Sequence, residues 1–216
     1  PIGRFVHMSG LESSFKSTTA YHIIANAQKM IKNVVIKEQD KKDKNKVNIR
    51  TEKHAMSAIL INVETGTFTK EYAEQLGVDT DSLLICQCAG MEEACDMLLE
   101  AQLKGVDLGV IDSIESLIPI KEYESNMNES VQMGIKPRLS GEFLRKFSAN
   151  NNKLLREGQQ PFTLIGLNQL RDKIGTYGTP LFAPGGRAWN FMASIEVMMR
   201  KGDIITQGTG VNKHAI

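Results

Sequence analysis

Cysteine is scarce in this sequence, where only Cys86, Cys88 and Cys95 are present. They form neither an even disulfide framework nor the paired C-x-x-C motifs that hold zinc, and the N-terminal residues show no secretory signal. No apolar run approaches the roughly 20 residues that a membrane-spanning helix needs. These absences argue against a disulfide-stapled secreted domain, a zinc-motif protein and a helical membrane protein. We expect a protein of a reducing cytoplasm.

The sequence also lacks an excess of charge of either sign, since its net charge is only +1. The chain as a whole is therefore not a basic wrap for nucleic acid. The balance is uneven, because nine Lys or Arg against four Asp or Glu lie between Lys29 and Lys53, and that segment carries +5. Within a basic insertion at about residues 33–56, we expect Lys37 to Lys53 to form an irregular excursion into solvent. A contact with duplex DNA or a partner is the alternative.

Short apolar runs alternate with longer amphipathic ones, which predicts an α/β fold with a mostly parallel twisted sheet and helices on both faces. Residues 1–216 are enough to bury the core of one domain without disulfides. We expect strands at Arg4 to Met8, Ala58 to Val63, Leu83 to Gln87, Leu108 to Asp112, Phe162 to Asn168 and Ser194 to Met199. We expect helices at Lys16 to Ile31, Phe68 to Leu76, Glu92 to Lys104 and Arg138 to Asn150.

Two long segments, Ile120 to Lys136 and Leu170 to Arg187, fit neither pattern. Long loops inside a compact domain are usually functional, so a binding surface is expected there. The chain begins at Pro1 without an initiator methionine, and we expect it to be a fragment of a longer protein.

The most specific local pattern is a phosphate-binding loop between the first expected strand and the first expected helix. It consists of Gly10, Leu11, Glu12, Ser13, Ser14, Phe15, Lys16, Ser17 and Thr18. In such a loop backbone N–H groups point at phosphate oxygens, Lys16 would reach the β and γ phosphates of ATP, and Ser17 would ligate Mg²⁺. Phe15 stands where the pattern G-x-x-x-x-G-K-[ST] has glycine, so an ordinary strand-to-helix turn is the alternative.

Two acidic residues follow at the ends of expected strands. Asp112 ends the apolar run that starts at Leu108, and it would hold Mg²⁺ through water, with a simple Asp-Ser turn as the alternative. Glu64 follows the run that ends at Val63, and it could polarise the water that attacks the γ phosphate. Both positions are consistent with ATP hydrolysis.

Several segments, in order along nearly the whole chain, resemble the RecA-like DNA strand-exchange recombinases. They are Gly3-Arg4-Phe5-Val6, Glu12-Ser13-Ser14, Tyr72 to Asp79, Asp112-Ser113, Leu117-Ile118-Pro119, Met133-Gly134, Asn168 to Gly175 and Pro184-Gly185-Gly186. The run Asn-Gln-x-Arg-x-Lys-x-Gly is the most discriminating of these. Some bacteriophage members of the family are similar in carrying Phe-Lys-Ser in the phosphate loop, so the resemblance makes Phe15 a subfamily trait.

The resemblance implies a RecA-like P-loop NTPase core and a role for each matching residue. Glu64 matches the glutamate that activates water, with Lys16 beside it in the catalytic set, and Tyr72 matches the aromatic residue that stacks on adenine. Gln169 matches the residue that senses the γ phosphate and passes that state to the second DNA-binding loop. A tyrosine packed against the sheet and a buried structural glutamine are the alternatives.

The resemblance also implies DNA-binding loops at about residues 120–136 and 169–187. The matching residues are Met133, Gly134, Arg138 and Arg145 in and after the first loop, and Arg171, Gly185 and Gly186 around the second. Arginines offer several donors to phosphate, and glycines let the backbone approach closely. A solvated helix face is the alternative for the two arginines after the first loop.

Phe191 matches an aromatic residue at the family's subunit interface, and Lys213 is a weak candidate for contact with a neighbouring subunit. The resemblance implies an ATP- and Mg²⁺-dependent recombinase, whose full-length form assembles as a homo-oligomeric helical filament on single-stranded DNA. It would pair that strand with double-stranded DNA, work with single-strand-binding or mediator proteins, and act in a bacterial or phage-infected cytoplasm. A hexameric replicative helicase and a non-hydrolysing regulatory paralogue are the alternatives.

Overall fold

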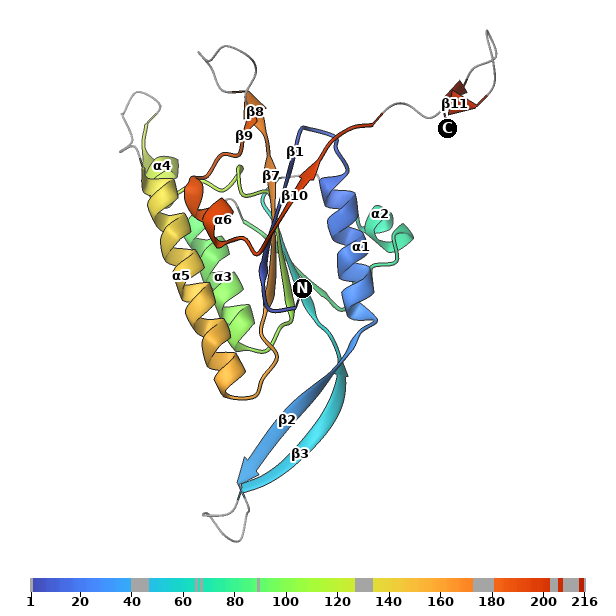
Figure 1. Ribbon diagram of the computed structural model, residues 1–216, viewed down its shortest axis with the longest axis vertical. Helices are drawn as coiled ribbons and strands as arrows, with labels where there is room; N and C mark the ends of the chain where they lie inside the picture. The colour runs from blue at the N-terminus through green and yellow to red at the C-terminus, as the bar shows by residue number, and fades with distance from the viewer. Residues whose placement is uncertain are drawn as a thin grey trace.

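The computed structural model is built around a six-stranded sheet in which neighbouring strands run parallel (Figure 1). The structure describes residues 2–39, 47–64, 66, 68–88, 90–126, 134–172, 181–202, 206–207 and 214–215. Across the sheet the strands are β10 (Ile195–Met199), β1 (Phe5–Gly10), β7 (Thr163–Gln169), β6 (Leu108–Asp112), β4 (Ala58–Asn62) and β5 (Leu83–Gln87). The α/β fold class and all six expected strands are confirmed.

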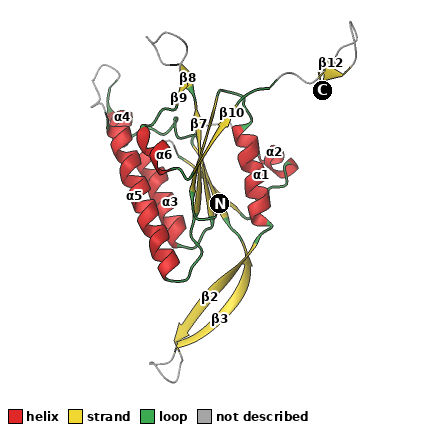
Figure 2. Cartoon of the chain, in the orientation of Figure 1, coloured by secondary structure: helices red, strands yellow, loops and turns green. Residues whose placement is uncertain are grey.

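Helices cover both faces of this sheet (Figures 1 and 2). One face carries α1 (Lys16–Gln28) and α2 (Lys70–Gln75), and the other carries α3 (Met91–Leu103), α5 (Ile135–Arg156) and α6 (Arg187–Met192). Successive residues of β4 enter the two cores in turn, with Ala58 and Leu60 in one and Ile59 and Ile61 in the other. A strand buried on both faces needs a continuous apolar run, which is why this segment was recognisable. No described helix is long and apolar enough to cross a membrane.

Helix α5 is longer than the sequence predicts, and buried amide groups explain its extension. The expected helix ends at Asn150, before a polar run that resembles a loop. Asn151 is instead buried, and its Oδ1 accepts a hydrogen bond from Gln102 Nε2 of α3 at 2.8 Å. Its Nδ2 donates to the Phe162 carbonyl at 2.9 Å. These contacts satisfy the polar side chain inside the protein, so the helix continues to Arg156.

The prediction that the basic segment is irregular is wrong for its described residues, which belong to a β-ribbon that extends away from the sheet. Strands β2 (Ile31–Gln39) and β3 (Val47–Ala55) pair antiparallel, and the expected first helix stops at Gln28 instead of reaching Ile31. The ribbon extends from the end of the sheet opposite the carboxyl ends of the strands (Figure 1). The β-branched residues of both strands favour an extended backbone. Pairing between the strands then satisfies their backbone N–H and C=O groups, although the segment has too few large apolar residues to form a core of its own.

The two expected loops also contain regular structure. Helix α4 (Ile120–Glu124) begins after Pro119, and α5 begins at Ile135, so the first expected loop is shorter than predicted. The second contains the antiparallel pair β8 (Arg171–Asp172) and β9 (Leu181–Phe182), and α6 starts at Arg187. Two further short strands, β11 (Thr206–Gln207) and β12 (His214–Ala215), pair near the C-terminus.

Gly109, the second residue of β6, tests how tightly the core is packed. A Cβ built there would lie 2.5 Å from Phe162 Cζ and 2.8 Å from Leu98 Cδ2. We therefore expect Gly109→Ala to lower the free energy of unfolding by about 1–3 kcal/mol through overpacking. Urea unfolding measures the change, with Gly202→Ala as control, since a Cβ at Gly202 meets no described atom within 4 Å. Equal stability of the two variants would contradict close packing at β6.

Candidate nucleotide site and DNA-facing segments

Residues of the predicted site meet at the carboxyl ends of four neighbouring strands. Gly10 ends β1 and pairs in register with Gln169, which ends β7. Asp112 ends β6 and pairs with Asn62 of β4, and Glu64 follows two residues later. Parallel strands end at one edge of a sheet, so four distant parts of the sequence are brought together there.

The phosphate loop is closed around its own lysine. Lys16 Nζ donates to the carbonyl oxygens of Gly10 at 3.0 Å and Leu11 at 2.8 Å, and to Ser14 Oγ at 3.3 Å. Burial lowers the pKa of Lys16, while the nearby charges of Asp112, Glu64, Glu115 and Glu12 oppose that shift. The ammonium group therefore lies inside the loop and among carboxylates, where a phosphate could replace the carbonyl partners.

Ser17 and Asp112 provide an oxygen pair next to the phosphate loop. The two residues come from the start of α1 and the end of β6, and the Ser17 hydroxyl is near enough to the Asp112 carboxylate to act on its pKa. Burial raises the pKa of Asp112, and the Ser17 hydroxyl opposes this shift. A hydroxyl and a carboxylate are ligands of the kind that Mg²⁺ prefers, so these residues fit the predicted metal site.

Phe15 has the backbone conformation for which glycine is normally required. It lies at φ 62° directly before α1, in the left-handed region, and Ser13 also has a positive φ of 55°. The Phe15 side chain is 69% exposed. The loop thus keeps its shape without glycine, and the ring lies in solvent instead of among the groups around Lys16.

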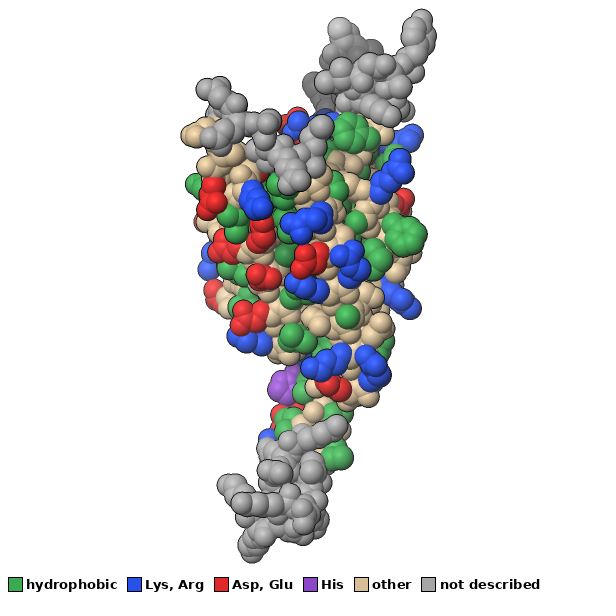
Figure 3. Space-filling view, turned by 90° about the vertical axis from the view of Figure 1, so that its left-hand side faces the viewer, with side chains coloured by type: hydrophobic (Ala, Val, Ile, Leu, Met, Phe, Trp, Pro, Cys, Tyr) green, Lys and Arg blue, Asp and Glu red, His purple; other side chains and the backbone are tan. Residues whose placement is uncertain are grey.

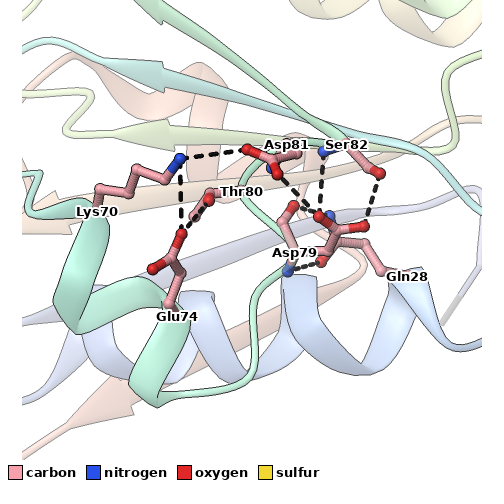
Figure 4. Close-up of polar contacts among 7 residues, drawn as sticks. All are labelled: Gln28, Lys70, Glu74, Asp79, Thr80, Asp81 and Ser82. Carbon is pink, nitrogen blue, oxygen red and sulfur yellow. Dashed lines mark hydrogen bonds and ion pairs between the residues drawn. The ribbon is translucent and has the colours of Figure 1, made fainter.

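Tyr72 lies beside the phosphate loop and not only against the sheet. Its hydroxyl is 2.9 Å from Thr18 Oγ1, its ring is 6.2 Å from that of Tyr21, and it is 40% exposed. Polar contacts fix helix α2, which carries Tyr72 (Figure 4). Gln28 of α1 donates to the Asp79 carbonyl at 2.8 Å and accepts from the Asp79 N–H at 2.9 Å. An ion pair from Lys70 to Asp81 links the same turn to α2, and Lys70 also pairs with Glu74 within that helix.

Glu64 is held by two hydroxyl groups. Ser113 Oγ and Ser116 Oγ donate to its Oε1 at 2.9 and 2.8 Å. Ser116 belongs to no recognisable motif, so its role could not be predicted from the sequence. Its contact with Glu64 depends on the turn after β6. Gln169 is half-buried, and the next residue, Leu170, donates its N–H to the Gly10 carbonyl at 3.0 Å. The end of β7 is therefore bonded directly to the phosphate loop.

Two candidate DNA segments flank this edge. The first, residues 134–145, begins at Gly134, with φ 96°, and carries exposed Arg138 and Arg145 on α5. The second, residues 169–172 and 181–187, includes Gly185 and Gly186 at φ 98° and 94°. On the face shown in Figure 3 basic and acidic side chains are interspersed, so no single basic patch marks a binding surface there.

Some predicted residues have other surroundings than expected. Arg171 forms an ion pair with Glu115, which the sequence reasoning did not single out. Phe191 is 88% exposed on α6, consistent with a surface position. Met133 and Lys213 lie outside the described residues.

A cavity of about 570 Å³ lies beside the second segment, and none of residues 10–18 of the phosphate loop lines it. Its lining includes His7, Ser9, Glu196 and residues 181–187. Next to it, fully buried Asn168 donates through Nδ2 to the Pro184 carbonyl at 2.8 Å. The second segment is thus attached to β7 one residue before Gln169.

Residues 44–215 match the family described as the RecA N-terminal domain. The chain belongs to the RecA family. Protein RecA of Mesomycoplasma hyopneumoniae strain J is 33% identical over 218 residues, covering 100% of this chain and 55% of that protein. Protein RecA of Ureaplasma parvum serovar 3 is 36% identical over 219 residues, with coverage of 100% and 55%. That of Streptomyces rimosus is 36% identical over 213 residues, covering 97% of this chain and 48% of the relative.

The family finding agrees with the recognition made from sequence motifs. The chain spans about half the length of the curated RecA proteins it matches. The phosphate loop precedes the matched family domain but lies within the alignments to these RecA proteins, two of which cover 100% of the chain. The likeness to bacteriophage members stays a prediction.

Replacing Phe15 by glycine separates the role of the ring from that of the backbone. We expect Phe15→Gly to bind ATP as tightly as the parent, and to raise the free energy of unfolding by up to about 1 kcal/mol, because glycine adopts positive φ without steric strain. Equilibrium ATP binding and urea unfolding test both points. Lys16→Ala is the control that should bind ATP more weakly. Loss of binding in Phe15→Gly would show that the ring belongs to the site.

Proposed function

We propose that this chain is the ATPase core of a DNA recombinase, which forms filaments on single-stranded DNA and pairs it with homologous duplex. The observation that carries the proposal is the meeting of Lys16, the Ser17–Asp112 pair, Glu64 and Gln169 at one sheet edge. RecA-family membership implies in general a nucleotide- and Mg²⁺-using, DNA-dependent ATPase. The finer roles below are our proposals.

The residues at the edge divide the work of hydrolysis. Lys16 and the loop N–H groups bind the phosphates, and Tyr72 offers a half-exposed ring to adenine beside Thr18. Ser17 and Asp112 would hold Mg²⁺, which supplies charge neutralisation of the β and γ phosphates. Glu64, which the Ser113 and Ser116 hydroxyl groups hold in place, accepts the proton of the attacking water.

The two alternatives predict different assemblies and turnover. A hexameric helicase would form rings, and a regulatory paralogue would bind nucleotide without turnover. Membership of the RecA family favours the recombinase over the ring-forming motor. Phosphate release with and without single-stranded DNA, combined with electron microscopy of the full-length protein, separates all three. DNA-stimulated release with filaments supports the recombinase, and rings or absent turnover would contradict it.

Glu64→Gln should retain ATP and DNA binding while slowing hydrolysis. The amide keeps the size of the side chain but cannot take the proton, and a general base contributes on the order of 10²–10⁴ in rate. Steady-state phosphate release measures the loss, with Glu100→Gln as control, because Glu100 is an exposed carboxylate on α3, outside the proposed site. A fall of less than about tenfold would assign the general base elsewhere.

Gln169→Ala should leave ATP affinity nearly intact but remove the dependence of single-strand binding on nucleotide. Gln169 ends the strand bonded to the phosphate loop and begins the second candidate DNA segment. Losing its amide should erase a coupling of about 1–3 kcal/mol. Single-strand affinity is compared with an ATP analogue and with ADP at one fixed salt concentration. Exposed Gln159→Ala is the control, and an unchanged ratio in Gln169→Ala would exclude the switch role.

A further inference from the structure

The turn at residues 113–117, which follows β6, connects the candidate nucleotide site with both candidate DNA segments. On one side Ser113 and Ser116 donate their hydroxyl groups to Glu64. Between these serines lies Glu115, whose contacts are with Arg171 of the second segment and Lys136 of the first. One short turn thus contacts Glu64, the carboxylate proposed as general base, and one cation from each candidate DNA segment.

Glu115 is a nearly buried carboxylate with few compensating groups. Its side chain is only 9% exposed, and Oε1 forms the ion pair with the Arg171 guanidinium. Its Oε2 is buried and has no hydrogen-bond partner among the residues that the structure describes. The backbone carbonyl of Glu115 accepts a hydrogen bond from Lys136 Nζ. The carboxylate therefore depends on Arg171 for its one direct ionic contact within the described part of the chain.

Arg171 is placed differently from its partner. Its side chain is 66% exposed, so the guanidinium is open to a ligand from solvent while it pairs with Glu115. Arginine is suited to phosphate through several donors in a fixed plane. A phosphate that approaches Arg171 also approaches the Glu115 carboxylate. Because Glu115 is nearly buried, solvent screens the repulsion between these two anions only weakly. The two anions then compete for one cation.

The charge of Glu115 also extends to the neighbouring lysines. It raises the pKa of Lys136, against the larger effect of burial, and contributes in the same direction to the pKa of Lys16 in the phosphate loop. The Arg171 charge acts on Lys136 in the opposite sense. Any shift of Arg171 away from Glu115 therefore changes the charge around Lys136 of the first segment.

We propose that Glu115 competes with the phosphates of single-stranded DNA for Arg171, and so sets how tightly the second candidate DNA segment binds. When Arg171 engages DNA, Glu115 loses its partner, and the turn that also carries Ser113 and Ser116 is released from one of its attachments. This inference rests on the proposed function, because it takes single-stranded DNA as the ligand of Arg171.

Glu115→Gln removes the charge while keeping the size of the side chain. Fluorescence anisotropy of a dye-labelled oligothymidylate, with ADP present and at fixed salt, reports single-strand affinity. We expect Glu115→Gln to tighten binding roughly threefold to tenfold, as removal of a competing charge at an interface does. Arg171→Ala should weaken binding, and adding Glu115→Gln in the Arg171→Ala background should change nothing further. Urea unfolding checks that each variant is folded, and Glu115→Ala should act in the same direction if the glutamine variant is not.

Glu157→Gln is the matched control, because it removes the same charge from an exposed position after α5, outside both candidate DNA segments. Its binding should equal that of the parent. Equally tighter binding in both variants would mean that the loss of any negative charge strengthens binding, and it would overturn the inference. Unchanged or weaker binding by Glu115→Gln, or tightening that persists without Arg171, would also overturn it. If the parent binds no single strands, the proposed function fails as well, whereas normal parental binding with an unresponsive Glu115→Gln rejects the competition alone.

Discussion

The candidate site depends on the parallel hydrogen bonding of β1, β7, β6 and β4. The pairing of Gly10 with Gln169 and of Asn62 with Asp112 fixes how far each strand reaches at its carboxyl end. A shift in register would displace the residues at these strand ends relative to one another by the rise of at least one residue, about 3.3 Å, which is enough to break the contacts between them. The geometry of the site is therefore set by the sheet. The tight packing around Gly109 stabilises the position of β6, which carries Asp112 at its end.

The sequence predicts those features that depend on local patterns. Mostly apolar runs identify all six strands of the sheet, and the four central strands β1, β7, β6 and β4 are almost entirely buried, as strands covered on both faces are. The phosphate loop and the acidic strand ends follow from spacing in the same way. The β2–β3 ribbon was missed because its stability comes from pairing between segments that each look solvated. Glu115 was missed for a related reason, since neither its burial nor its pairing with Arg171 is encoded near it in the chain.

At Phe15 the phosphate loop keeps the backbone conformation that its motif requires, although the glycine of that motif is replaced by phenylalanine. A left-handed backbone at a residue with a side chain costs roughly 1–2 kcal/mol, and the loop adopts it at both Ser13 and Phe15. Three hydrogen bonds from Lys16 Nζ to the loop offset part of this strain. The same ammonium group is the one proposed to bind phosphate, so nucleotide binding has to exchange internal partners for external ones. The loop is thus held closed by the residue that would bind its ligand.

In the described part of the chain, the nucleotide edge mixes cations with carboxylates, so the proposed binding of nucleic acid there does not rest on net positive charge alone. The most basic segment of the sequence, with +5 between Lys29 and Lys53, includes the ribbon, which extends from the opposite end of the sheet. At the nucleotide edge the cations lie among Asp112, Glu64 and Glu115. We therefore expect a polyanion to bind there through individual arginines and glycine-rich backbone, and to take the place of internal carboxylates as the partners of those arginines. An interface of this kind responds to the rearrangement of single ion pairs, and this makes its affinity open to control by a nucleotide bound a few residues away.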